Sequence, residues 1–138
     1  MPPEAAHVRD WLLKARNDWS AARKLLGGAE AETDVVGFHC QQAVEKLLKA
    51  FLLSRSVEFE KIHDLRRLIG QCAAIDSEFN SLREEVRPLT AYAAACRYPG
   101  LPSLTAEEAQ QALVVVRKVW EFVAKRLPPA AVPPAVQE

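Results

Sequence analysis

Apolar residues recur along most of the chain at steps of three and four, the spacing that places side chains on one face of an α-helix. Five such stretches follow one another, separated by short segments rich in glycine, proline or polar residues. Runs of strictly alternating apolar and polar residues, which would indicate β-strands, are missing from the sequence. The pattern therefore predicts an all-α protein with five amphipathic helices.

The first two predicted helices cover residues 4–26 and 34–54, and the glycine pair at 27–28 ends the first of them. Asp34 is of a residue type that caps helix N-termini. The apolar faces consist of Val8, Leu12, Ala15, Trp19, Ala22 and Leu26 in the first helix and of Cys40, Val44, Leu47, Phe51 and Leu52 in the second. Both helices are long enough to be main helices of a bundle.

The third predicted helix starts after a polar connection at residues 55–63, with Asp64 as its N-cap, and the fourth starts near Asp76 or Ser77. Pro88 interrupts the fourth helix and should kink or split it, because proline removes a backbone donor and clashes with the preceding turn. The apolar faces consist of Leu65, Leu68, Ile69 and Cys72 in the third helix and of Phe79, Leu82, Val86, Leu89, Ala93 and Cys96 in the fourth.

The fifth predicted helix follows a break at residues 97–102 and starts at Thr105, with Glu108 placed to complete a capping box. Its apolar face consists of Ala109, Leu113, Val116, Trp120, Val123 and Leu127. Four of the last eleven residues are proline, so we expect residues 128–138 to form an extended, flexible tail. The remaining residues, 1–127, should fold as one antiparallel up-and-down helical bundle of four main helices, with the short third helix across one end.

Composition narrows the classes of function. The chain has 138 residues, 49% of them hydrophobic, and its 18 basic residues balance 18 acidic ones. Zero formal charge argues against a protein that coats double-stranded DNA, because such binding requires many lysines and arginines, but it leaves room for a small phosphate pocket. No stretch approaches the roughly 18 to 20 apolar residues of a membrane span, and the first residues do not resemble a secretion signal.

The cysteines and the short motifs point to a protein without metal or cofactor. Cys40, Cys72 and Cys96 lie far apart and form no CxxC pair, so we expect reduced, mostly buried thiols in a cytoplasmic protein. A glycine-rich phosphate loop, GxSxG and HExxH are all missing from the sequence. We therefore predict no metal site and no cofactor.

A stripe of polar residues runs along the second predicted helix at steps of three, four and three: His39, Gln42, Lys46 and Lys49. Three basic residues accompany one acidic residue between positions 35 and 57, so this stretch is locally basic in a neutral chain. Such a stripe can hold an anion or a nucleotide, or it can be a solvated face or a subunit contact.

Two further groups carry candidate chemistry. His63 stands at the start of the third helix, where a positive charge is unfavourable, so a neutral imidazole there could act as a base. Arg97 offers a planar fork of donors suited to phosphate, and Tyr98 can stack on a base. The alternatives are a histidine that only hydrogen-bonds across the bundle end and an arginine that binds free carbonyls at its helix C-terminus.

Four segments together resemble the HEPN family in their order and spacing. They are WLLKARNDWSAARKLL (11–26), FHCQQAVEKLLKAFL (38–52), IHDLRRL (62–68) and AYAAACRYPG (91–100). The resemblance covers about residues 8–127 and implies a prokaryotic helical bundle that pairs as a homodimer or higher homo-oligomer. It also implies a minimal nucleotidyltransferase as partner in a toxin–antitoxin pair, and either nucleotide binding or metal-independent RNA cleavage. Carried onto this chain, it indicates a ligand site formed by Gln42, Lys46, Lys49, His63, Arg97 and Tyr98.

One feature departs from the nuclease members of that family, which carry a histidine within a few residues after the arginine. The 41 residues that follow Arg97 contain none. We therefore predict first a nucleotide- or phosphate-binding accessory subunit of a minimal nucleotidyltransferase. The alternatives are a metal-independent RNase toxin, with Arg97 and His63 as candidate catalytic residues, and a structural homodimerisation module without a ligand. Whether the protein is an enzyme stays open at this point.

Overall fold

A computed structural model describes residues 3–59 and 61–137, and within these ranges the chain is helical and has no β-strand. This confirms the predicted all-α class and the helical bundle. The elements in chain order are α1 (Pro3–Leu26), α2 (Thr33–Ser54), α3 (Leu65–Ile75), the 3₁₀ helix η1 (Ser77–Leu82), α4 (Arg83–Val86), α5 (Leu89–Arg97), α6 (Ala106–Ala124) and the 3₁₀ helix η2 (Pro129–Ala131).

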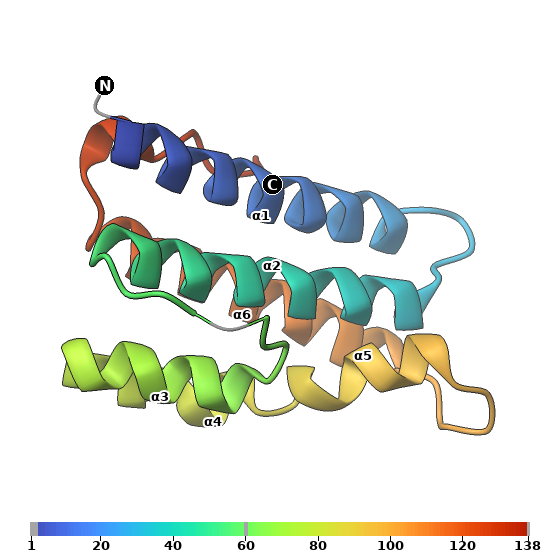
Figure 1. The fold of residues 1–138 in the computed structure, drawn as a ribbon. Coiled ribbons are helices and arrows are strands. Elements are labelled where there is room, and N and C mark those ends of the chain that lie inside the picture. The colour runs from blue at the N-terminus through green and yellow to red at the C-terminus, as the bar shows by residue number, and fades with distance from the viewer. Residues whose placement is uncertain (1–2, 60, 138) are drawn as a thin grey trace.

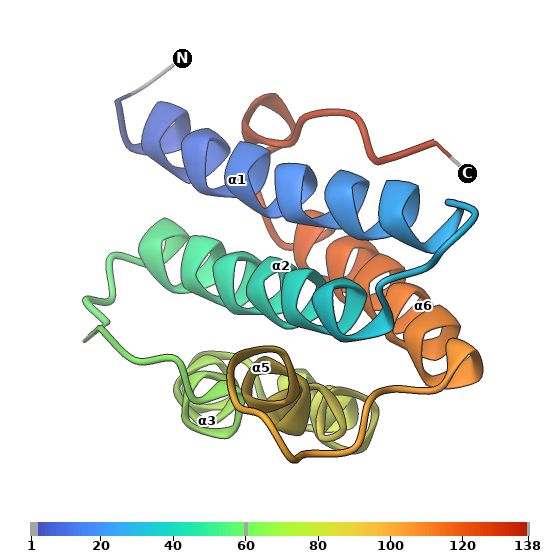
Figure 2. The ribbon, with the colours of Figure 1, turned by 90° about the vertical axis from the view of Figure 1, so that its right-hand side faces the viewer.

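Helix α2 is the central element of the fold. It lies between α1 on one side and the shorter helices α3, α4 and α5 on the other, with α6 beside it (Figures 1 and 2). Thirteen of its 22 residues are buried, because it meets neighbours on most of its circumference. The largest fully buried side chains include Trp19, Phe51 and Phe79, which come from three different elements and pack into one core.

The predicted apolar faces form that core, with few exceptions. Leu26, Ala93 and Leu113 are only half-buried, and Cys96 is exposed. The reason for Cys96 is its position: residues 96–103 are all exposed, since the last turn of α5 and the connection after it project from the bundle (Figure 1). Periodicity placed Cys96 on the apolar face, but no neighbouring helix covers that end of α5 within the described chain.

Two of the three predicted caps are confirmed. The Asp64 carboxylate accepts a hydrogen bond from the Arg66 amide at the start of α3, and the Thr105–Glu108 capping box is complete. Asp34, in contrast, does not cap α2, which begins one residue earlier. Its carboxylate instead accepts hydrogen bonds from Leu104 N (2.9 Å) and from a neighbouring serine, so it ties the entry of α6 to the start of α2.

The fourth predicted helix is divided, as the proline predicted, and its first part differs in type. Pro88 separates α4 from α5. Residues 77–82 form the 3₁₀ helix η1 rather than an α-helix, with Asp76 as its N-cap. The prediction that the third helix crosses one end of the bundle is wrong: α3 lies beside α2 (Figure 1), with Cys72 Sγ 3.7 Å from Leu48 O.

The C-terminal segment packs against the bundle, whereas its proline content predicted a free tail. Ala131 and Val136 are buried. Arg16 of α1 donates to Pro134 O and Arg117 of α6 donates to Val136 O, both at 2.7 Å, so the two helices hold the segment through its backbone carbonyls. Residues 132–137, after η2, are in neither a helix nor a strand, and the expected extended, flexible character of the segment stays a prediction.

Gly37 of α2 packs closely against Tyr92 of α5 and against Leu104. A Cβ atom there would lie 2.6 Å from Leu104 Cδ2 and 3.0 Å from Tyr92 Cβ, both too close. Overpacking of this kind costs about 1 to 3 kcal/mol, which offsets the roughly 1 kcal/mol that alanine adds to a helix interior. We expect Gly37→Ala to be no more stable than the wild type in urea unfolding. The matched variant Gly70→Ala, whose Cβ meets Arg83 Nη2 at 3.7 Å, should gain about 0.5 to 1 kcal/mol. A gain of that size in Gly37→Ala would contradict the close packing.

Candidate functional site

Two residues on the polar face of α2, His39 and Lys46, are paired with a carboxylate of α1. Asp18 of α1 accepts a hydrogen bond from His39 Nδ1 (2.8 Å) through one oxygen and from Lys46 Nζ through the other. The side chains of His39 and Lys46 remain about one-quarter exposed, at 27% and 24%. Lys46 is therefore a paired cation at the surface rather than a free one.

Glu45, which directly precedes Lys46 on α2, has a buried carboxylate that is the centre of a second polar group. It accepts hydrogen bonds from Lys49 Nζ (3.0 Å), from Gln41 Nε2 (3.3 Å) and from His63 Nδ1, which is 3.1 Å from each of its oxygens. Gln41 in turn accepts a hydrogen bond from Gln42 Nε2 (2.8 Å). The carboxylate is thus fully engaged although it lies in the interior.

Lys49 is shielded from ligands. Its side chain is 6% exposed, and its ammonium lies 5.8 Å from the ring centroid of Trp11 and 5.5 Å from that of Phe59. The two rings meet edge to face, with their centroids 5.4 Å apart. Lys49 is therefore the counter-ion of Glu45, and the rings of Trp11 and Phe59 shield it from solvent.

His63 combines a buried partner with an exposed ring. Its side chain is 74% exposed, whereas that of Glu45 is 4% exposed. Since a carboxylate only accepts, Nδ1 is the nitrogen that donates; in the neutral ring this tautomer leaves Nε2 as an acceptor. Nε2 has no partner in the part of the chain that the structure describes. This is the arrangement of an oriented general base.

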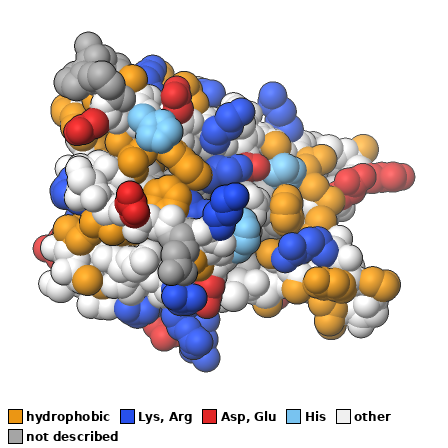
Figure 3. All heavy atoms as spheres, in the orientation of Figure 1, with side chains coloured by type: hydrophobic (Ala, Val, Ile, Leu, Met, Phe, Trp, Pro, Cys, Tyr) orange, Lys and Arg blue, Asp and Glu red, His pale blue; other side chains and the backbone are white. Residues whose placement is uncertain are grey.

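Arg97 and Tyr98 lie apart from these groups, at the exposed end of α5. The guanidinium of Arg97 donates to Ala93 O of its own helix (3.3 Å) and lies 6.0 Å from the ring centroid of Tyr98. Tyr98 is 60% exposed. Figure 3 shows basic and histidine side chains gathered across the middle of this face, and hydrophobic side chains gathered at its lower right, over the end of α5.

The structure therefore brings together some of the predicted site residues and leaves others separate. Gln42, Lys49 and His63 belong to one hydrogen-bonded network around Glu45, and Lys46 belongs to the neighbouring group on Asp18. None of the contacts of Arg97 or Tyr98 within the described chain reaches either group. The predicted residues form two polar groups on α2 and one arginine–tyrosine pair on the projecting turn.

The sequence analysis missed the acceptors that organise these groups: Asp18, Gln41 and Glu45. Glu45 stands four residues before Lys49, a spacing that favours an ion pair on a helix, so that contact could have been predicted. Asp18 lies on another helix, 28 residues before Lys46, and no local pattern indicates their contact.

The described residues contain no group of three or more His, Cys, Asp or Glu side chains placed to hold a metal ion. Burial raises the pKa of the Cys40 and Cys72 thiols to about 12, with the Asp18 carboxylate adding to the effect at Cys40. Both thiols are therefore poor nucleophiles. In the described ranges, no helix has the length and apolar character needed to cross a bilayer.

Comparison with known proteins adds one finding. The sequence profile of the HEPN domain matches residues 8–127, nearly the whole bundle and all four segments singled out in the sequence. No curated protein and no solved structure was found to match the chain.

Proposed function

Since the chain belongs to the HEPN domain family, we propose that it is a nucleotide- or RNA-binding accessory subunit of a minimal nucleotidyltransferase, acting as a cytoplasmic homodimer in a toxin–antitoxin pair. The observation that carries this proposal is the exposed guanidinium of Arg97, which has no acidic partner in the described chain, beside the exposed ring of Tyr98. Together they offer a fork of donors to a phosphate and an aromatic face to a base.

The contrast with the lysines of α2 supports Arg97 as the phosphate contact. Lys46 is paired with Asp18, and Lys49 is paired with Glu45 and covered. A ligand phosphate would have to displace a carboxylate from either lysine. Arg97 has no acidic partner among the described residues, so its charge is available without such an exchange.

The surroundings of Arg97 also support a homodimer. Leu101 is 47% exposed on the same projecting turn as Tyr98, and hydrophobic side chains gather there (Figure 3). Exposed apolar side chains that cluster at one place are typical of contact surfaces. A second copy of the chain on this turn would place two Arg97 side chains near one another.

We expect Arg97→Gln to weaken binding of a fluorescently labelled, mixed-sequence single-stranded RNA by about tenfold, because one charge-assisted contact to phosphate is lost. Fluorescence anisotropy measures the affinity. Arg23→Gln is the matched control, since Arg23 is an exposed arginine in the last turn of α1 as Arg97 is in the last turn of α5. Equal affinity of wild type and Arg97→Gln would remove Arg97 from the site; binding by neither would favour a purely structural dimer.

The Glu45–His63 contact favours a second candidate function, metal-independent RNA cleavage. No histidine follows Arg97, so His63 would take the 2′-hydroxyl proton, with Glu45 holding its ring. RNA incubated in EDTA tests this candidate. If the wild type cleaves, His63→Gln should lose about 100-fold or more of the rate, as the removal of a general base does. Intact RNA with the wild type would reject this candidate and leave the binding function.

A further inference from the structure

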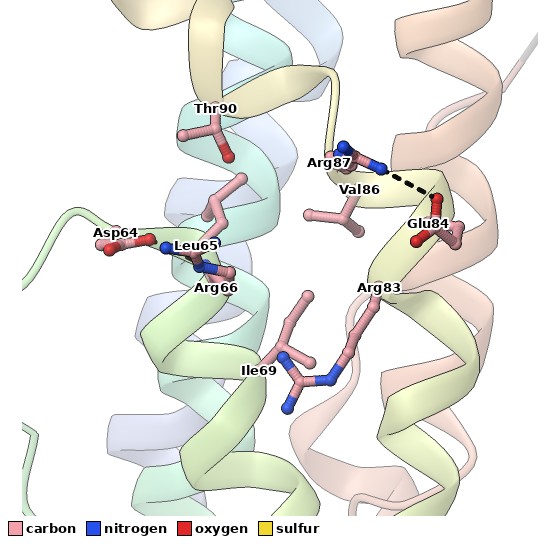
Figure 4. A pocket seen from close by; sticks show the side chains of 9 residues that line it. All are labelled: Asp64, Leu65, Arg66, Ile69, Arg83, Glu84, Val86, Arg87 and Thr90. Atoms are coloured by element: carbon pink, nitrogen blue, oxygen red, sulfur yellow. Dashed lines mark hydrogen bonds and ion pairs between the residues drawn. The ribbon is translucent and has the colours of Figure 1, made fainter.

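A groove of about 540 Å³ lies between the start of α3, helix α4 and the start of α5, and its lining begins at Asp64, the residue after His63. Leu65, Ile69 and Val86, each 1% exposed, lie beneath it, and Figure 4 shows the arginines of its rim together with the carboxylates of Asp64 and Glu84. A volume in this range is typical of small-molecule sites, which combine apolar walls with a few charged groups.

Arg83 is held in position at this groove. Its Nε donates to Asn80 Oδ1 (2.8 Å), and its Nη2 lies 3.7 Å from where a Cβ on Gly70 would be. The side chain thus reaches from α4 across to α3, and glycine at position 70 leaves the space beside the guanidinium open. Both Nη groups are without an acceptor among the described residues. A guanidinium oriented through Nε presents the remaining donors as a fork.

Arg66 supplies a second cation from the opposite side. It is exposed in the first turn of α3, and its guanidinium has no acidic partner in the described ranges. Figure 4 shows Arg66 and Arg83 on the two sides of Ile69. Arg87, the third arginine of the rim, is already paired with Glu84 (3.4 Å). Arg66 and Arg83 therefore have no ion-pair partner within the described ranges, although the Asp64 carboxylate, which caps α3, lines the same groove.

We propose that this groove binds a phosphate monoester with an apolar body. A phosphate monoester carries a charge of about −1.5 to −2 at pH 7, which matches the two unpaired arginines better than a single carboxylate does. Its body would lie against the aliphatic parts of the rim side chains, above the buried Leu65, Ile69 and Val86, and its phosphate oxygens would accept from Arg66 and Arg83. This site is separate from the Arg97 turn and does not depend on RNA binding there.

The test is a titration of the ¹⁵N-labelled protein with phenyl phosphate, followed by NMR chemical shifts. We expect saturable shifts at residues that line the groove, and much weaker effects from phenol, which lacks the anion, and from inorganic phosphate, which lacks the body. The double variant Arg66→Gln/Arg83→Gln should bind phenyl phosphate at least tenfold more weakly. Arg23→Gln, at an exposed arginine in the last turn of α1 and outside the groove, should bind it like the wild type.

A second variant tests the groove without changing either arginine, in case the double variant Arg66→Gln/Arg83→Gln does not fold. Thr90 is an exposed residue of the rim, and Thr90→Glu would add a negative charge there while leaving both arginines in place. We expect it to weaken binding as well, and the ¹⁵N spectra of both variants to keep the wild-type dispersion. Shifts centred elsewhere, no saturation, or undiminished affinity in the double variant would overturn the proposal.

Discussion

Replacing Glu45 with alanine should lower the free energy of unfolding by about 3 to 5 kcal/mol, the typical effect of removing one partner of a buried ion pair. The reason is that the substitution leaves the Lys49 ammonium buried without its counter-ion. Lys49 would keep its buried position between Trp11 and Phe59 but lose the carboxylate 3.0 Å away. Urea unfolding measures the loss, provided that the slope of unfolding free energy against urea concentration is the same in the wild type and the variant.

The double variant Glu45→Leu/Lys49→Met separates the charge effect from the loss of packing. It removes both charges and keeps similar volume, and replacing a buried pair by apolar residues is often neutral or stabilising. We expect it to recover most of the stability lost in Glu45→Ala. If Glu45→Ala lost less than about 1 kcal/mol, Lys49 would have found another partner or reached solvent, contrary to its burial here.

Phe79→Ala should lower the free energy of unfolding by a similar amount, about 3 to 5 kcal/mol, as is usual when a buried aromatic ring is truncated. Phe79 is fully buried on η1, and its ring centroid lies 4.4 Å from that of Phe51 on α2 and 4.8 Å from that of Phe122 on α6. Phe79 therefore packs the layer of short helices against α2 and α6. Thermal and urea unfolding of the purified variant measure the change.

Leu101→Ala is the control for that experiment. Leu101 is 47% exposed on the turn after α5, so its truncation should change stability by no more than about 0.5 kcal/mol in the monomeric fold. A loss in Phe79→Ala no larger than in Leu101→Ala would show that η1 is not fixed to the core by this ring.

The fold was predictable from the sequence to the extent that apolar spacing determines it. The stripes from Val8 to Ala22 and from Leu65 to Cys72 are buried as expected, because a surface helix must cover one face. Pro88 was a reliable signal for a break. The same spacing did not distinguish the 3₁₀ helix η1 from an α-helix, since both place residues three apart on one side.

The candidate site was less predictable, for a physical reason. The sequence reveals which side chains are cationic but not which carboxylates reach them from other helices. The sequence predicts both Lys46 and Lys49 as anion ligands. In the structure, Lys46 is paired with Asp18, and Lys49 is buried next to Glu45. Arg97 keeps the role that the sequence suggested, as a proposal, because no acidic residue approaches it in the described chain. The arginines of the groove were not singled out, because three separate elements bring its lining together.

The measurement that tests the central claim most directly is the affinity of wild type and Arg97→Gln for single-stranded RNA over a series of salt concentrations. Each lysine or arginine contact with a phosphate contributes about 0.7 to the slope of log affinity against log salt for single strands. We predict that Arg97→Gln binds more weakly and has a slope shallower by about that amount for each Arg97 in contact with phosphate. Identical affinities and slopes for the two proteins would contradict a phosphate contact at Arg97, and with it the proposed function.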